Sequence, residues 1–423
     1  MKIEEPTNKN YSAVVVRLNP NSFQELAGLD NLKSVSIFGY QILVGKDTQE
    51  QLGVFFPAEV QLSDEFCSNS NLYRHSNLNK EPSEKGYLED SRRVRAVKFK
   101  GHVSSGLFLP MSSLEYTGIN TNLLTEGDSF DKLNGKDICA KYEVFKNTQL
   151  IKNQQKQYSR TDKKFMPEHI DTENFFRNSH LISPESKVTI TQKLHGTSIR
   201  IANTLVNRQP NLVERIAKFF GAKIQSTEYS YLYGSRKVIK DANNPNQNHF
   251  YDFDLWSEEG KKLDGMLPKN YIVYGELIGW TRDGKPLQKG YTYGIKKGEC
   301  ELYIYRITNI NEDGYMTDLS WHQVKEFCNN HGLKSVPQIG LYLMSEIIAD
   351  DFKIVRDLMD VRYFENGFRN TVWLGEDEVV DEGICVRAEG LLPRILKAKA
   401  PKFLLHESTV LDTGEEDLES SQN

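Results

Sequence analysis

Two short segments hold lysines whose type and spacing suit chemistry on a phosphate. Lys193 opens the segment KLHGTS directly after a strand-like run, and Lys397 and Lys399 alternate in the segment LKAK. A lysine attacks an electrophile only as the free amine, and about 0.1% of an ordinary lysine is in that form at neutral pH. Partial burial and neighbouring cations raise that fraction. Two lysines at i and i+2 of a strand share one face and could grip a phosphate, although a solvated strand edge would give the same pattern.

Three further segments keep a fixed order with these lysines. Arg236 comes about 40 residues after the first lysine, Glu276 ends the apolar run YIVYGE, and Glu382 precedes the run GICVR. A carboxylate at the end of an apolar strand is either a surface rim residue or a contact to a ligand. The order of the segments is the informative feature, because a KxHG segment alone is a weak signal.

In this order the segments resemble the motifs of the covalent nucleotidyltransferases, a superfamily of RNA ligases, DNA ligases and mRNA capping enzymes. The KxHGT form of the first segment is similar to the phage RNA ligase 2 family. Val94–Pro110 (VRAVKFKGHVSSGLFLP), after a β-rich start, resembles the OB-domain that Deinococcus- and Naegleria-type RNA ligases place before the transferase domain. Together these likenesses cover residues 11 to about 403. They imply an ATP-dependent RNA ligase that seals a 3′-hydroxyl to a 5′-phosphate, with AMP carried on Lys193.

The resemblance also implies a partner, cofactors and a role for each site residue. The partner would be RNA, at nicks in a duplex, and the cofactors ATP and Mg²⁺ or Mn²⁺. Catalysis would rest on Lys193, Lys397 and Lys399. Nucleotide contacts would come from His195, Gly196, Arg236, Glu276 and Tyr305. The metal would be held by Glu382 and Glu276, and Thr197 and Arg200 are secondary candidates.

The sequence departs from the phage RNA ligase 2 pattern at two places. Ser198 stands where that family usually has asparagine, and Tyr305-Arg306 stands where it commonly has Phe-Asp. Tyr303 projects to the same face of its strand as Tyr305, so the adenine-stacking position could be displaced by two residues. The chain ends about 20 residues after the LKAK segment, which leaves no room for the C-terminal OB-domain of DNA ligases and capping enzymes.

Three other functions remain open from the sequence. An ATP-dependent DNA ligase or a capping guanylyltransferase would share the same motifs, and labelling with ATP against GTP would separate the latter. A non-catalytic nucleic-acid-binding protein with a decayed transferase domain is the alternative from another class. The intact lysines and glutamates of the motifs argue against decay.

The elements expected around these motifs define an α+β chain. An N-terminal OB-fold β-barrel over residues 1–140 would bind nucleic acid, and a basic linker and lead-in would span 141–184. A nucleotidyltransferase domain built on antiparallel sheets would span 185–410, followed by an acidic disordered tail over 411–423. Strands are expected at 11–18, 34–44, 54–57, 94–99, 103–110, 187–192, 271–278, 302–307, 383–387 and 394–397, and helices at 321–332 and 351–362. A basic cluster in the expected barrel predicts phosphate contacts: Arg92, Arg93, Arg95, Lys98 and Lys100.

Composition sets the broad class. The chain has 423 residues and a formal net charge of −5, which allows two or three domains and leaves the RNA surface to a local basic groove. Its five cysteines lie apart without a CxxC pair. This spacing disfavours a zinc site or a disulfide framework and fits a reducing, cytoplasmic setting. No apolar stretch approaches the ~18 residues of a membrane span, and we expect a monomer.

Overall fold

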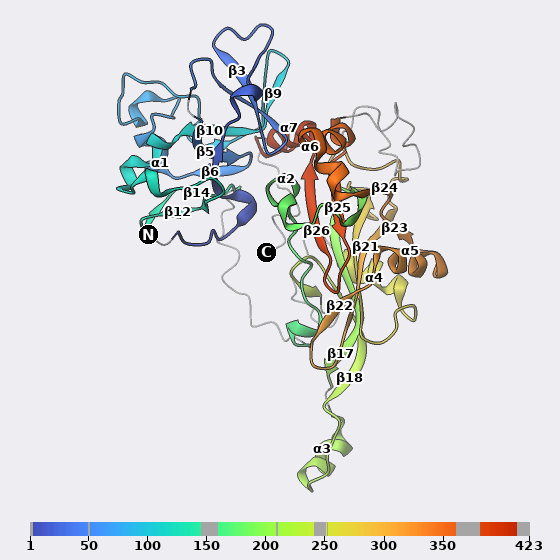
Figure 1. Ribbon diagram of the computed structural model, residues 1–423. Coiled ribbons are helices and arrows are strands. Elements are labelled where there is room, and N and C mark those ends of the chain that lie inside the picture. Colours follow the sequence, from blue (N-terminus) through green and yellow to red (C-terminus); the bar gives the residue numbers. More distant parts are fainter. Residues whose placement is uncertain are drawn as a thin grey trace.

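The computed structural model describes residues 3–49, 51–144, 160–208, 210–240, 251, 253–360 and 381–412 (Figure 1). Most of the expected acidic tail and residues 145–159 of the expected linker lie outside these ranges.

Two mostly antiparallel sheets carry the motif segments. β-Branched and apolar residues fill these strands, which favours strands buried on both faces. The first sheet has the order β15 (Glu173–Asn174), β26 (Arg394–Lys399), β25 (Gly383–Ala388), β16 (Lys187–Lys193) and β24 (Gln338–Leu343). The second has the order β19 (Ile239–Lys240), β18 (Thr227–Gly234), β17 (Thr197–Asn207), β20 (Tyr271–Gly279), β21 (Cys300–Ile310) and β22 (Met316–Asp318), with β23 (Lys334–Ser335) also paired to β21. The strands expected in this half are thus confirmed, each longer than the sequence indicated.

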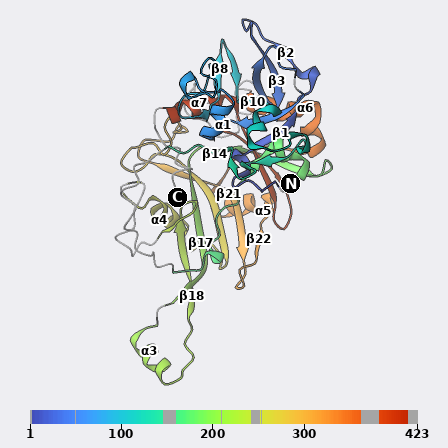
Figure 2. The ribbon, with the colours of Figure 1, turned by 90° about the vertical axis from the view of Figure 1, so that its left-hand side faces the viewer.

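One hairpin of the second sheet projects away from the rest of the molecule. β17 and β18 extend together, and α3 (Leu212–Phe219) lies at the tip of the hairpin in both views (Figures 1 and 2). A capping box begins this helix, in which Asn211 and Glu214 exchange side-chain and backbone hydrogen bonds.

Smaller antiparallel sheets make up the N-terminal part of the chain, called here the N-terminal sheets. They comprise β10 (Gly106–Pro110), β5 (Leu52–Pro57), β1 (Ala13–Arg17) and β11 (Ser129–Phe130); β14 (Cys139–Lys141), β6 (Val60–Leu62) and β7 (Arg93–Val94); β2 (Gln24–Glu25), β3 (Leu32–Ile37) and β4 (Tyr40–Gly45); β8 (Val97–Phe99) and β9 (His102–Ser104); and β12 (Lys132–Leu133) and β13 (Lys136–Asp137). Strand pairing does not close these sheets into a barrel among the described residues, so the closed OB-type barrel is not confirmed.

The strand expected at 34–44 is wrong as a single element. Phe38 and Gly39 have φ of 50° and 70°, and Ile37 pairs with Tyr40 across a tight turn. Two consecutive positive φ values produce the hairpin turn whose twist matches the flanking strands, so the run divides into β3 and β4.

Hydrophobic packing joins the N-terminal sheets to the motif-bearing sheets. Val14, Val35 and Phe55 belong to the same buried cluster as Ile190 of β16 and Val386 of β25. A second cluster lies wholly within the N-terminal sheets. The first cluster therefore crosses the boundary expected near residue 140.

Six further α-helices of the described residues lie outside the sheets. They are α1 (Asp64–Asn69), α2 (Phe175–Asn178), α4 (Leu255–Gly260), α5 (Trp321–Asn330), α6 (Met344–Asp360) and α7 (Pro401–Asp412). The helix expected at 321–332 is confirmed as α5. The one expected at 351–362 begins earlier, as α6, is interrupted by left-handed backbone at Asp350–Phe352, and has its last two expected residues outside the described ranges. Within the described ranges, no helix combines the length and apolar character that crossing a bilayer requires.

Candidate active site

Strand register brings Lys193 and Lys399 to the same level of the first sheet. Lys193 is paired with Gly383 across β16 and β25, and Gly383 is paired with Lys399 across β25 and β26. Gly383 has φ of 147°, and a Cβ there would lie 2.0 Å from the Ala398 carbonyl oxygen. Only glycine fits this position, which sets the residue before it, Glu382, between the two lysines.

Glu382 is the charged centre of this row. Its Oε1 lies 2.6 Å from Lys193 Nζ and 3.9 Å from Lys399 Nζ, and its side chain is only 1% exposed. Its Oε2 lies 3.6 Å from His195 Nδ1. Lys399, a cation that the sequence predicts near Lys193, is thus present, but the Glu382 carboxylate lies between the two lysines.

Glu276 joins the KxHG segment to β20. Gly196 N–H donates to Glu276 Oε1 at 3.1 Å, and Ser198 Oγ donates to Glu276 Oε2 at 3.2 Å. A Cβ on Gly196 would lie 2.2 Å from the Leu277 carbonyl oxygen, so the segment approaches β20 as closely as glycine permits. Ser198, the departure from the phage pattern, serves here to orient a carboxylate.

A cavity of about 100 Å³ lies on one side of Lys193. Five of the expected site residues line it: Lys193, Arg236, Glu276, Tyr305 and Lys397. The other four, His195, Gly196, Glu382 and Lys399, are not among its lining residues. His195 lies behind the lysine, with its ring edge-on to those of Tyr291 and Phe403 at 4.7 and 5.0 Å between centroids.

A strand irregularity selects the aromatic that faces the cavity. Tyr274 pairs with Arg306 and Gly275 pairs with Ile304, which leaves Tyr305 as the extra residue of a bulge in β21. Tyr305 lines the cavity, whereas Tyr303 is not among the lining residues. The bulge explains why the two tyrosines, which the sequence could not tell apart, take different positions.

The lead-in expected to be a linker contributes to this cavity. His169 lines it and packs edge-on to Tyr305, with 4.9 Å between ring centroids. Asp171 Oδ1 lies 2.8 Å from Arg236 and 4.0 Å from Lys397 Nζ. Sequence reasoning missed both residues, because they stand in a polar stretch without a strand-like or helix-like pattern.

Three arginines singled out in the sequence have structural roles. Arg200 is 1% exposed and donates to the backbone carbonyls of Ser235 and Met166 at 2.8 Å each. Arg306 forms a fully buried ion pair with Asp318, which accounts for the arginine beside Tyr305. Arg93 is 3% exposed and pairs internally, so the expectation that it contacts phosphate is wrong.

Two buried tyrosines and a histidine pack beside the KxHG segment. The His195 backbone N–H donates to the Tyr293 hydroxyl oxygen at 2.6 Å. Burial raises the pKa of Tyr293 well above its ordinary value and does the same for Tyr291. Burial also lowers the pKa of His406, with the neighbouring charges of His195 and Lys289 as further causes. These side chains are therefore uncharged near neutral pH.

The carboxylates of the site fit a hard divalent cation that arrives with a nucleotide. The described residues contain no group of three or more His, Cys, Asp or Glu side chains arranged to hold a metal. Mg²⁺ in phosphate-transfer sites commonly uses one or two carboxylates and completes its shell with phosphate oxygens and water. Glu276 and Glu382, both buried beside the KxHG segment, match that requirement.

Comparisons with known proteins identify the architecture. The RNA ligase family model matches residues 186–399. The solved structure of Naegleria gruberi RNA ligase with PPi has a TM-score of 0.58 at 16% identity, covering 95% of this chain and 100% of that one. A mutant of that ligase with ATP and Mn gives 0.56 at 17% identity, covering 95% and 99%. A mutant in the apo form gives 0.59 at 17% identity, covering 96% and 99%. No curated protein matches this sequence.

Proposed function

Since the chain belongs to the RNA ligase family, we propose that it uses ATP to join a 3′-hydroxyl to a 5′-phosphate of RNA through AMP carried on Lys193. The observation that carries this proposal is the cavity that Lys193 lines. Two cations, a carboxylate and an aromatic ring line it too, namely Arg236, Lys397, Glu276 and Tyr305. The Naegleria ligase structures with ATP and Mn and with PPi support ATP as the nucleotide and a divalent metal as its companion.

In the first step Lys193 Nζ attacks the α-phosphorus of ATP. A nitrogen–phosphorus bond forms, the bond from the α-phosphorus to the bridging oxygen breaks, and pyrophosphate leaves with the electron pair. Lys193 gives up its ammonium proton before the attack, and the nitrogen loses a second proton to solvent as the phosphoramide forms. Lys399 lies beside the Glu382 oxygen that Lys193 contacts, and it would stabilise the charge that builds on the reacting phosphate.

The remaining site residues bind and orient in this proposal. Tyr305, held by His169, would stack on adenine. Arg236 would clamp a phosphate, and Lys397 would stabilise charge on the reacting phosphate. A divalent cation would be held by Glu276 and Glu382 and would neutralise phosphate charge. Arg236 and Lys397 are already oriented by Asp171.

Two further transfers complete the reaction. The RNA 5′-phosphate oxygen attacks the lysyl-linked AMP, so that the nitrogen–phosphorus bond breaks and an AMP-capped RNA forms. The 3′-hydroxyl then attacks the RNA phosphate, and AMP leaves as the phosphodiester forms. The substrate we propose is a nick in duplex RNA, because a duplex holds both ends in place without further protein contacts.

We also propose that residues 1–140 form an OB-type module for the RNA backbone. Lys98 is an exposed cation on β8, and OB-type sheets commonly hold nucleic acid on one face. Arg93 has no part in this, since it is buried. The setting we propose is intracellular, with the chain acting as a monomer.

The test is covalent labelling with ATP. The protein incubated with labelled ATP and Mg²⁺ is expected to acquire a covalent adduct that survives denaturation and alkali. Lys193→Ala is expected to form no adduct but still to seal a pre-adenylated RNA, since AMP is then already attached. GTP in place of ATP separates a guanylyltransferase, and matched DNA nicks separate a DNA ligase. Labelling of Lys193→Ala at the wild-type level would refute the assignment.

A further inference from the structure

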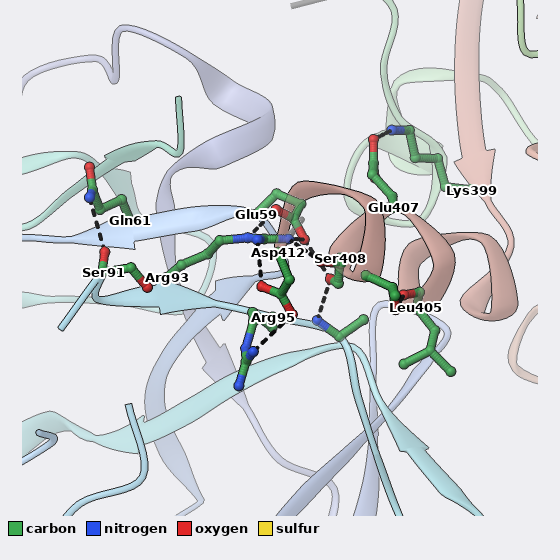
Figure 3. Close-up of polar contacts among 12 residues, drawn as sticks. Glu59, Gln61, Ser91, Arg93, Arg95, Lys399, Leu405, Glu407, Ser408 and Asp412 are labelled. Carbon is green, nitrogen blue, oxygen red and sulfur yellow. Dashed lines mark hydrogen bonds and ion pairs between the residues drawn. The ribbon is translucent and has the colours of Figure 1, made fainter. Parts of the chain in front are cut away.

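The C-terminal helix α7 reaches both the candidate site and the N-terminal sheets (Figure 3). Glu407 Oε1 lies 2.6 Å from Lys399 Nζ, and the side chains of Lys399 and Glu407 are 15% and 10% exposed. One residue later, Ser408 Oγ accepts from the Ala96 backbone N–H at 3.0 Å and donates to Glu59 Oε1 at 2.5 Å. Adjacent residues of one helical turn therefore contact the site and the N-terminal sheets.

The contacts to the N-terminal sheets form a network whose centre, Arg93 with Glu59 and Ser408, is buried. Arg93 donates to both carboxylate oxygens of Glu59, at 2.6 and 2.9 Å, to the Ser408 carbonyl at 3.0 Å and to Asp412 at 3.0 Å. Arg95 adds a bond to Asp412 at 2.9 Å. A buried, hydrogen-bonded charge network has low tolerance for displacement, because losing one partner leaves a charge uncompensated. The network thus fixes where α7 lies on the N-terminal sheets.

Lys399 is held from several sides by the same elements. The Tyr40 hydroxyl, on β4 of the N-terminal sheets, donates to the Lys399 carbonyl at 3.0 Å. The Lys399 ammonium lies 5.3 Å from the ring centroid of Phe403 on α7. A second cavity, of about 70 Å³, is lined by Lys397, Lys399 and Glu407 together with Tyr40 and other residues of the N-terminal sheets. This cavity gives the Lys399 side chain room to move if its partner is lost.

The position of Lys399 matters because it shares a carboxylate with the nucleophile. Lys399 Nζ is 3.9 Å from the Glu382 oxygen that Lys193 contacts at 2.6 Å. The closer contact of Lys399 is with Glu407. Without the Glu407 charge, attraction to Glu382 would draw Lys399 toward the oxygen that orients Lys193.

We propose that Glu407 is a positioning residue that holds Lys399 for phosphoryl transfer, and that α7 makes this positioning depend on the docking of the N-terminal sheets. The inference rests on the proposed function of Lys193 and Lys399. Glu407 acts through Lys399 and contacts no substrate itself.

The first experiment measures single-turnover formation of the lysyl adduct by the full chain with labelled ATP. Glu407→Gln is expected to slow this step about ten-fold, the loss typical of a charge-assisted hydrogen bond, with the KM for ATP changed less than about two-fold. Glu407→Asp, which keeps the charge on a shorter side chain, is expected to recover part of the rate. The matched control is Glu326→Gln on the exposed face of α5, which makes the same change of charge away from the site.

A double-mutant cycle separates positioning from general stabilisation. In a Lys399→Ala background, Glu407→Gln is expected to have no further effect, because the residue that it positions is gone. Equal slowing in both backgrounds, or a wild-type rate for both Glu407 variants, would overturn the proposal. Thermal unfolding of each variant shows whether it is folded at the assay temperature. If Glu407→Gln is unfolded there, Glu407→Asp takes its place in the cycle.

The dependence on docking has its own test. Ser408→Ala removes two contacts to the N-terminal sheets without altering Glu407 or Lys399. We expect about three-fold slower adduct formation, again absent in the Lys399→Ala background. An unchanged rate would overturn the link to the N-terminal sheets and leave the role of Glu407 intact. If the wild-type chain forms no adduct on Lys193, the proposed function fails, and this inference fails with it.

Discussion

Gly196→Ala offers the sharpest test of how the KxHG segment is positioned. The added methyl group would lie 2.2 Å from the Leu277 carbonyl oxygen, 2.8 Å from Ile278 Cγ2 and 3.0 Å from Glu276 Cγ. Carbon atoms sit about 3.5 Å or more from such neighbours, so relief requires a backbone displacement of about 1 Å. The backbone of β20 is buried and paired on both sides, which leaves the KxHG segment as the part that moves.

The expected cost follows from that displacement. A misplacement of about 1 Å at a reacting group costs on the order of 100-fold in rate. Overpacking of a buried position costs roughly 1–3 kcal/mol of stability, which a chain of this size can tolerate. We therefore expect Gly196→Ala to remain folded and to form the lysyl adduct about 100-fold more slowly than wild type.

The assay is single-turnover labelling with ATP, with Gly45→Ala as control. The nearest neighbour of a methyl group at Gly45, at the end of β4, is Thr48 Oγ1 at 3.5 Å, an ordinary contact. This control is expected to label within about two-fold of wild type. A folded Gly196→Ala protein that labels as fast as Gly45→Ala would show that close approach of the segment to β20 has no part in positioning Lys193.

Three other substitutions test separate parts of the structure. Tyr305→Ala is expected to raise the KM for ATP about ten-fold because stacking on adenine is lost, whereas Tyr305→Phe should keep a KM near that of wild type. The rate of labelling at varied ATP concentrations gives the KM of each variant. Asp318→Asn leaves the buried Arg306 charge uncompensated and should lower the free energy of unfolding by about 3–5 kcal/mol in urea denaturation. Burial raises the pKa of Tyr40 from 10.0 to about 12. The stability that the neutral Tyr40 hydroxyl contributes is therefore complete below about pH 10 and is lost as pH rises toward 12. The free energy of unfolding of Tyr40→Phe should fall less between about pH 9 and 11 than that of wild type.

The strands of the motif-bearing sheets could be predicted because their sequences are long and consistent. β16 and β20 are runs of apolar and β-branched residues that suit a strand buried on both faces. The sequence predicts one strand where β3 and β4 form a hairpin, because both arms alternate apolar and polar residues next to the turn, which only Phe38-Gly39 marks. A turn that needs two positive φ values leaves a weak signal when one of its residues is phenylalanine.

The candidate site was predictable where its residues stand in motifs and hidden where they meet across the fold. Lys193, Glu276 and Lys397 belong to segments with a recognisable order. Asp171 approaches Lys397 because β15 pairs with β26 in parallel, a register that no local pattern encodes. Glu407 lies on a helix whose position depends on the N-terminal sheets, so its contact with Lys399 is a consequence of tertiary packing alone.

The pairing of charges in the candidate site explains how the proposed phosphate-binding surface can lie on an acidic chain. The net charge of −5 gives no hint of an anionic partner. In the structure each site cation lies against a carboxylate: Lys193 with Glu382, Lys399 with Glu407, and both Arg236 and Lys397 with Asp171. The carboxylates keep the cations oriented before a phosphate arrives, which lowers the ordering cost of binding. They also compete with the phosphate, so the site gains positional precision at the expense of affinity. The proposed substrate, a duplex RNA that presents both ends together, would suit such a site, because contacts elsewhere along the strand would supply the affinity that the paired cations give up.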